Sequence, residues 1–341
     1  MTRRARRPAV TVLLAAALVL VLAAVSAARA AFGTPQRLLS DVGSVTVAAT
    51  GGTLWVASQP AAGGSTELRA LDAATGAVTA GRTLGPVTTD SVLYALGWLW
   101  VTAVDSKGQS PQLLRLDPHS LATLSTTALA TRHGYVSVAS AGASIWVGDG
   151  GELDQVTAIG GQIVRRVPLP GAADIEVATG PGGQSLLVSE DNGSGLAHVQ
   201  RRDPRTGALL AASARFLGAF HPFLGGTIAN RLWLSEATGL QGYVQQLDAG
   251  TLRPTSATLP PLGTTNGVRA SVDDGILWIT QNGGRPSVNY CADPVTGRRR
   301  VTLPAPVDRG RVVAEDAARI YYVTESFPGA LMSLRIPRRC R

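Results

Sequence analysis

One short apolar pattern recurs along the whole chain. Each copy has two large apolar residues, the second usually Trp or Tyr, followed by an aliphatic residue and a small residue. An apolar run of this length, bounded by Gly and Ser, is typical of a strand that is buried on both faces. The second residues of the seven copies, which follow one another at intervals of 41 to 46 residues, are Trp55, Trp100, Trp146, Leu187, Trp233, Trp278 and Tyr322.

Each copy lies inside a longer unit with a constant order of elements. An alternating run such as 45–48 precedes it, and a Gly/Ser-rich loop and a third strand follow it. The third strand ends in a turn such as 72–76, 203–207 or 293–297, which begins with Asp and ends with Gly. Asp accepts hydrogen bonds within such a turn, and Gly supplies its left-handed residue. A fourth strand such as 162–165 completes the unit.

Repeats of 40 to 50 residues that contain four strands are typical of β-propellers. We therefore predict an all-β fold, a seven-bladed β-propeller of four-stranded blades. The repeated aromatic residue of the second strand is expected to pack between neighbouring blades.

The seventh unit has no fourth strand after 331–335, whereas a strand-like segment at 34–39 is left over at the N-terminal side. An open ring would expose an unpaired sheet edge. The N-terminal strand is therefore predicted to close blade seven, with Gln36–Leu39 pairing with Leu331–Arg335.

The first 30 residues have the pattern of an export signal. Four arginines within residues 3–7 precede an apolar run at 9–25, and Ala28-Arg29-Ala30 matches a signal peptidase site. We expect 1–30 to be a signal peptide or a retained N-terminal anchor, and 31–341 to be a single domain. The chain is then exported across the cytoplasmic membrane and is either secreted or membrane-anchored on the outside.

Charge and cysteine content narrow the possible partners. The chain is 45% hydrophobic and 16% charged, which suits a folded core. Its net charge of +8 falls to +3 once the five arginines of residues 1–30 are removed. Because this is not the footprint of a nucleic-acid binder, we expect no nucleic-acid partner, membrane contact only through an uncleaved N-terminal segment, and a monomer. Cys291 and Cys340 lack the spacing of a zinc site, and in an exported chain they predict a disulfide.

Some repeats resemble known propeller families. Tyr322-Val323-Thr324-Glu325 is similar to the YVTN repeat, and Leu232–Glu236 resembles the repeat of streptogramin lyase-like proteins. The chain thus resembles the YVTN/NHL-like seven-bladed superfamily. In streptogramin lyase-like enzymes His, Glu and magnesium carry out a β-elimination. The resemblance implies His133, which precedes Gly134, as a catalytic candidate, and less closely His221, which precedes Pro222.

Strand order predicts where a site would lie. In a propeller, the loops that enter the first strand and those that leave the second strand meet at one mouth of the channel. Two histidines, His133 and His221, are the catalytic candidates, and Glu236 and Glu325 are candidate ligands of Mg or Ca, which carboxylates coordinate. The candidate ligand-binding residues at this mouth are Asp90, Asp149, Asp174, Glu190, Glu236, Asn266, Gln281 and Glu325.

Two functions follow from this pattern. One is a non-catalytic propeller that binds a small molecule, a glycan or a protein at its channel face. The alternative is a metal-assisted lyase or hydrolase that uses the histidines and carboxylates of the mouth. The sequence contains no complete catalytic motif, which favours the first function. The polar residues also suit ordinary solvated loop ends.

Overall fold

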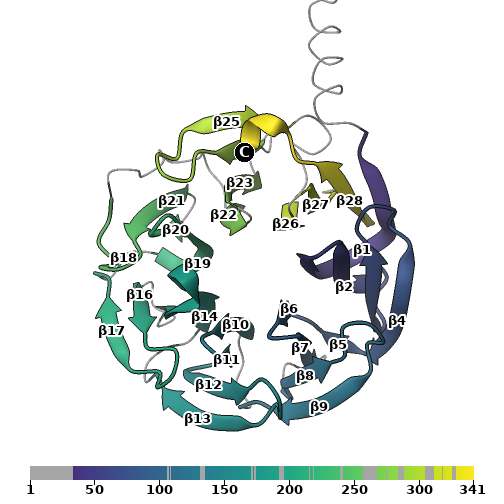
Figure 1. Cartoon of the computed structure of the whole chain (residues 1–341), viewed down its shortest axis with the longest axis horizontal. Helices are drawn as coiled ribbons and strands as arrows, with labels where there is room; N and C mark the ends of the chain where they lie inside the picture. Colours follow the sequence, from purple (N-terminus) through teal and green to yellow (C-terminus); the bar gives the residue numbers. More distant parts are fainter. Residues whose placement is uncertain are drawn as a thin grey trace, which may run out of the picture.

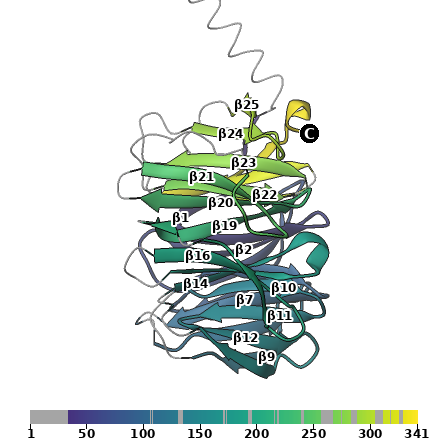
Figure 2. The same cartoon turned by 90° about the vertical axis from the view of Figure 1, so that its left-hand side faces the viewer.

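Antiparallel sheets stand side by side in a ring around a central axis (Figure 1). The ring is thinner than it is wide when seen from the side (Figure 2). This computed structural model describes residues 34–105, 107, 109–130, 135–169, 172, 174–191, 196–214, 216–217, 219–238, 241–255, 267–273, 275–282, 288–303, 311–316, 318–324 and 328–341. The predicted export segment, 1–30, lies outside this range. Within it, no helix is both long and apolar enough to cross a membrane.

The chain forms a seven-bladed β-propeller, as predicted. In each blade the main strands follow one another from the channel to the rim in chain order. The exceptions are β5 and β6, which both pair with β7, the short β18, which pairs with β16, and blade seven, whose outermost strand is the first part of β1. The first three blades contain β1 (Gln36–Thr50), β2 (Thr53–Pro60), β3 (Thr66–Asp72) and β4 (Val78–Gly85); β5 (Val87–Thr88), β6 (Val92–Ala95), β7 (Trp98–Asp105), β8 (Gln112–Leu116) and β9 (Thr123–Ala128); and β10 (Ser137–Ala141), β11 (Ser144–Asp149), β12 (Glu152–Thr157) and β13 (Ile163–Pro168).

The remaining four blades follow the same order. In blade five, the described residues after β21 run to 255 and include an isolated antiparallel bridge between Pro254 and Leu247. The strands of these blades are β14 (Asp174–Thr179), β15 (Leu186–Asp191), β16 (Leu196–Arg202), β17 (Leu209–Ala212) and β18 (Phe216–Leu217); β19 (Ala219–Ile228), β20 (Arg231–Thr238) and β21 (Gln241–Asp248); β22 (Gly267–Asp273), β23 (Ile276–Asn282), β24 (Val288–Ala292) and β25 (Arg299–Thr302); and β26 (Arg311–Glu315), β27 (Arg319–Val323) and β28 (Gly329–Arg335).

Strand β1 belongs to two blades and closes the ring. Its first part pairs with β28, with Gln36 opposite Ser333 and Leu39 opposite Leu331. Its second part, from Val42 onwards, pairs with β2 as the innermost strand of blade one. Between the two parts the chain turns at Asp41, whose φ is +58°. The predicted pairing of the N-terminal strand with the last strand is therefore confirmed.

The repeated aromatic residue joins neighbouring blades. Trp100, Trp146 and Trp233 are completely buried, and the side chain of each packs in an apolar cluster. Trp146 Nε1 also donates a hydrogen bond of 3.0 Å to the Pro204 carbonyl, in the Asp-Pro turn of the next blade. Trp55 and Trp233 make the same contact with Pro118 and Pro294. The indole thus packs its apolar body between blades and satisfies its N–H group at the same time.

The Asp turns form as predicted. In the turn of blade one, Asp72 Oδ1 accepts hydrogen bonds from the backbone N–H groups of Ala74 and Thr75 and from the Thr75 hydroxyl. Asp293 is bound in the same way in blade six, and these hydrogen bonds, led by that of the Thr296 amide, lower its pKa to about 2. Each turn joins the third strand of a blade to the fourth.

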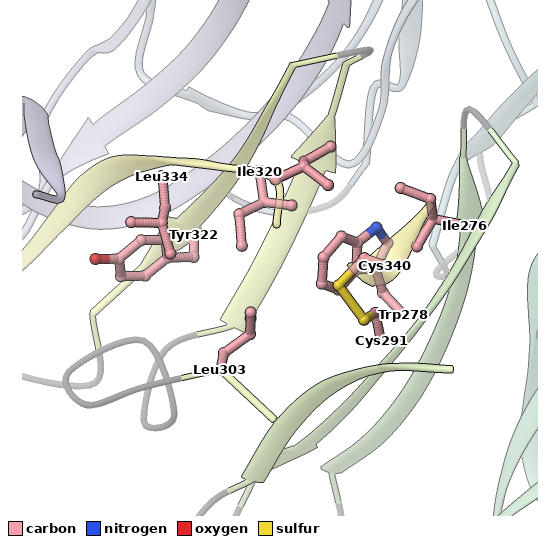
Figure 3. Close-up of a cluster of buried hydrophobic side chains, with 9 residues drawn as sticks. Ile276, Trp278, Cys291, Leu303, Ile320, Tyr322, Leu334 and Cys340 are labelled. Atoms are coloured by element: carbon pink, nitrogen blue, oxygen red, sulfur yellow. A yellow bond between two sulfur atoms is a disulfide. The ribbon is translucent and has the colours of Figure 1, made fainter. Parts of the chain in front are cut away.

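The two cysteines form the predicted disulfide, Cys291–Cys340, with their Cα atoms 5.7 Å apart. Cys291 lies on β24 in blade six, and Cys340 ends the short 3-10 helix Arg338–Cys340 after blade seven. Both are buried in an apolar cluster with Trp278, Ile320 and Leu334 (Figure 3). The bond fastens the C-terminal tail across two blades.

Candidate functional site

The innermost strands surround a cavity of about 490 Å³ in the middle of the ring. Residues from all seven blades line it, from Thr46 on β1 to Val312 on β26. The apolar lining comes mainly from Val, and the charged side chains are few. The charged and aromatic residues that line it are Asp90, Tyr135, Glu176, Phe223 and Arg269.

One equivalent position of the innermost strand differs between the blades in the contact that it makes. In the sheet it pairs with the residue two after the central Trp, Leu or Tyr of the second strand. In blade seven this position is not among the described residues. In the other six blades it is occupied by Thr46, Ser91, Ser137, Glu176, Phe223 and Arg269.

In blades one to four this position bonds to the backbone of the next blade. We call these four contacts the inner belt. Its buried member, Ser137, both donates to the Ile175 carbonyl and accepts from the Val177 amide, so one hydroxyl satisfies two backbone groups. The belt contacts are Thr46 Oγ1 to Thr89 O at 2.8 Å, Ser91 Oγ to Val136 O at 3.0 Å, Ser137 Oγ to Ile175 O at 3.1 Å, and Leu224 N to Glu176 Oε2 at 2.8 Å.

In blades five and six the same position makes a different contact. The Arg269 guanidinium carbon lies 4.4 Å from the centre of the Phe223 ring, which is a cation–π contact between the two blades. Val268 and Ala270, on either side of Arg269, are buried between blades, so strand alternation turns Arg269 towards the channel, where it is exposed. This arc therefore presents a positive charge to the cavity.

A second polar group faces the channel at blades two and three. The Tyr135 hydroxyl donates a 3.1 Å hydrogen bond to the Asp90 carbonyl, and Asp90 Oδ2 accepts one of 3.1 Å from the Val136 amide. Burial raises the pKa of Tyr135 to about 12, and the negative charges of Glu176 and Asp90 add to the increase. Arg269 acts in the opposite direction on this pKa. The tyrosine hydroxyl therefore stays protonated near neutral pH.

Three of the predicted site residues have described side chains, and one of them lines the cavity. Asp90 does so, as given above. Asp149 is 1% exposed at the end of β11, inside the wall. Glu190 Oε1 lies 2.8 Å from His198 Nε2 and accepts a 2.8 Å hydrogen bond from Gln200 Nε2, so it belongs to a polar cluster on β15 and β16. Sequence reasoning did not consider His198, although it lies opposite Glu190.

The other predicted residues lie at positions that the structure describes only in part or not at all. Asp174, His221, Glu236 and Gln281 lie on β14, β19, β20 and β23, and their side chains are outside the described part of the chain. His133, Asn266 and Glu325 are themselves outside it. Among the described residues, no group of three or more His, Cys, Asp or Glu could hold a metal ion. The metal site at Glu236 and Glu325 stays a prediction.

Sequence reasoning missed Tyr135, Glu176, Phe223 and Arg269. It looked for the site in the loops at the mouth, whereas Glu176, Phe223 and Arg269 lie within the innermost strands. A signal was present, because Glu176 and Arg269 each interrupt an apolar strand, in Ile175-Glu176-Val177 and Val268-Arg269-Ala270. Both of these charged residues line the cavity.

A buried carboxylate lies in the wall, away from the cavity. Asp154 on β12 is completely buried, and its Oδ1 lies 3.6 Å from Nε of the half-exposed Arg166. Burial raises the pKa of Asp154 to about 6, Glu152 adds to the increase and Arg166 opposes it. This acid is therefore partly protonated in weakly acidic solution.

Solved structures share the architecture at low sequence identity. BamB from Moraxella catarrhalis is 14% identical, with a TM-score of 0.56 over 86% of this chain and 84% of that one. Kuenenia stuttgartiensis hydrazine synthase is 13% identical, with a TM-score of 0.62 over 87% and 96%. The computationally designed protein Ika8 is 15% identical, with a TM-score of 0.54 over 88% and 100%. No family model and no curated protein matches the chain. At these identities the likeness concerns the β-propeller fold alone.

Proposed function

We propose that this protein is an exported β-propeller that binds a small ligand in its central channel. The observation that carries the proposal is the cavity of about 490 Å³, to which all seven blades contribute lining residues. Its volume falls within the range of small-molecule sites, roughly 300–1,000 Å³. Propellers commonly bind partners, and an apolar wall with a few fixed polar groups is the usual composition of a binding site.

Polar groups from opposite sides of the ring support binding in the channel. Asp90, Tyr135 and Glu176 stand on blades two to four, and Arg269 stands on blade six. Hydrogen bonds to the backbone hold Asp90 and Glu176 in place before any ligand arrives. Such preorganisation lowers the entropy cost of binding, because these side chains do not have to be ordered when a ligand binds.

The resemblance of the repeats to streptogramin lyase-like proteins makes a metal-assisted lyase or hydrolase the alternative. That function would act through His133 and His221. The described lining favours binding instead, because its acidic side chains Asp90 and Glu176 serve as hydrogen-bond acceptors for the backbone of neighbouring blades.

Ser271 offers a direct test of channel binding. This residue is exposed on β22 and lines the cavity, so Ser271→Trp would fill part of it. The matched control is Ile159→Trp, at a rim turn where the side chain is 84% exposed. Purified wild-type protein is screened by thermal shift against a metabolite library and divalent cations, since binding to the native state raises the apparent stability. We expect the stabilising compounds to act on the wild type and on Ile159→Trp, but not on Ser271→Trp. Equal stabilisation of Ser271→Trp would place the binding outside the channel.

A further inference from the structure

Arg269 is held in the channel by its neighbours before any ligand binds. Its strand, β22, pairs with β23 along its whole length, and Arg269 stands opposite Thr280. The Phe223 ring of blade five supports the guanidinium at 4.4 Å. A guanidinium on an aromatic face keeps its orientation and leaves its N–H edge accessible.

The donors of Arg269 are not used within the protein. A guanidinium has five N–H donors, and in the described part of the chain none of those on Arg269 has a hydrogen-bond acceptor or an acidic partner. Arg115 provides the contrast within the same molecule. It also stands over an aromatic ring, that of Trp98, but it donates a 3.1 Å hydrogen bond to the Ala158 carbonyl. Arg115 thus has a structural role, whereas the N–H groups of Arg269 can donate hydrogen bonds to a ligand.

The charges of the channel select the kind of anion. A carboxylate matches the fork of one guanidinium with two parallel hydrogen bonds. Its single negative charge is then balanced by Arg269. A phosphate dianion would bring a second charge into a cavity that already contains Asp90 and Glu176, and like charges repel.

The rest of the lining suits an apolar ligand body. The Phe223 ring and the side chains of Val272 and Val312 line the cavity on blades five, six and seven, that is, on the blade of Arg269 and on the two next to it. Apolar surface that is removed from water there contributes to binding without a charged partner. The combination fits a monocarboxylate with an apolar body.

We propose that the ligand of the channel carries a carboxylate group and that Arg269 binds it. This inference rests on the proposed function and narrows its ligand class. Arg269 selects the carboxylate by charge and fork geometry, and Phe223 positions the guanidinium.

Benzoate, hexanoate, inorganic phosphate and the neutral benzamide are the probes for this proposal. Calorimetric titration of the purified protein at millimolar probe concentrations is expected to show binding of the two carboxylates, with benzamide and phosphate at least about tenfold weaker. Arg269→Gln is expected to lose at least about tenfold in carboxylate affinity, and Arg269→Lys to keep part of it, because Lys has the charge but not the fork. Arg298→Gln, an exposed arginine at the end of a turn in the same blade, is the matched control and is expected to bind like the wild type.

The outcomes separate this proposal from the proposed function. Circular dichroism first establishes that each variant is folded. Wild-type affinity for benzoate in folded Arg269→Gln, equal binding of benzamide, stronger binding of phosphate, or no carboxylate binding at all would each overturn the carboxylate proposal. Channel binding itself would still stand if Ser271→Trp abolished the binding of a neutral probe or library compound. It would fail if Ser271→Trp left every such interaction intact.

Discussion

The two sides of the channel use the same strand position in different ways. In blades one to four, Thr46, Ser91, Ser137 and Glu176 bond to the backbone of the next blade and form the inner belt. In blades five and six, Phe223 and Arg269 contact each other and face the cavity. A residue that holds the wall together has few groups left for a ligand. The comparison therefore supports the proposal that a ligand of the channel would bind beside blades five and six.

Contacts outside the cavity join blades five to seven. Trp233 Nε1 donates a hydrogen bond to the Pro294 carbonyl of the next blade, and the disulfide Cys291–Cys340 ties blade six to the C-terminal tail. Strand β1 then closes blade seven. These contacts lie away from the cavity, so they leave the inner strands of this arc accessible to a ligand.

The largest expected effect is that of opening the ring, on which both arcs depend. Deleting residues 31–40 from a chain that starts at residue 31 removes the part of β1 that pairs with β28. The exposed edge of β28 then invites association between chains, and we expect an aggregating protein without a cooperative unfolding transition. Size-exclusion chromatography and thermal unfolding measure this, with the chain that starts at residue 31 as the control. An unchanged melting temperature would falsify the assigned role of β1.

Removing the disulfide, which links blade six to the C-terminal tail, is expected to have the next largest effect. Replacing both cysteines by alanine, Cys291→Ala with Cys340→Ala, is expected to lower the free energy of unfolding by about 3–4 kcal/mol, because a cross-link over 49 residues restricts the unfolded chain. Chemical denaturation measures the loss. Wild-type protein that has been reduced should lose a similar amount. If reduction left the stability unchanged, the bond would not hold the tail in the way we describe.

Asp154 provides a pH-dependent test of the wall. Its pKa is raised from 3.8 to about 6 in the folded protein, so its protonated form favours folding below pH 4 and this stability is lost as the pH rises through 6. The variant Asp154→Asn lacks this titration. The stability of the variant minus that of the wild type should therefore increase by about 2–3 kcal/mol between pH 4 and pH 8. Urea unfolding at several pH values gives the difference. A difference that is constant with pH would contradict the buried, weakly compensated carboxylate.

Two serine substitutions compare the inner belt with the channel face of blade six. Ser137→Ala leaves the buried Ile175 carbonyl and Val177 amide without the hydroxyl that satisfies both, which is expected to cost about 2 kcal/mol of stability. Ser271→Ala, on the exposed channel face of β22, is expected to change stability by less than about 0.5 kcal/mol. Equal effects of the two substitutions in chemical denaturation would remove the distinction between the arcs.

The smallest expected effect concerns the position of Arg269. Phe223→Leu keeps an apolar side chain but removes the ring face under the guanidinium. We expect benzoate affinity to fall by about three- to fivefold, which corresponds to about 0.5–1 kcal/mol for an exposed cation–π contact. The melting temperature without ligand should stay the same. Calorimetry measures the benzoate affinity of this variant, of Arg269→Gln and of the double variant. If the double variant binds benzoate no more weakly than Arg269→Gln alone, Phe223 acts through Arg269.

Much of the fold was readable from local patterns. The seven copies of the apolar motif predicted the blades, the Asp–Gly turns predicted their outer hairpins, and the missing fourth strand after 331–335 predicted the closure by β1. The site was less readable. Offsets in the loops found Asp90, but they also selected Asp149 and Glu190, which the structure places in the wall and in a cluster with His198.

The sequence by itself determined the repeat, the order of strands and the pairing of the two cysteines, because each of these depends on local periodicity, on turn chemistry or on the count of candidates. Only the tertiary structure decided which polar side chains meet. Thr46, Ser137 and Arg269 occupy equivalent positions in three strands, yet the first two bond to the backbone of the next blade, whereas Arg269 contacts the Phe223 ring instead. That outcome depends on the distance to the neighbouring backbone and on the side chain opposite. Gly148, for example, leaves room beside Ser137, since a Cβ there would come within 3.0 Å of the serine hydroxyl. Such distances arise between blades that are about 40 residues apart in the chain, where no local pattern records them.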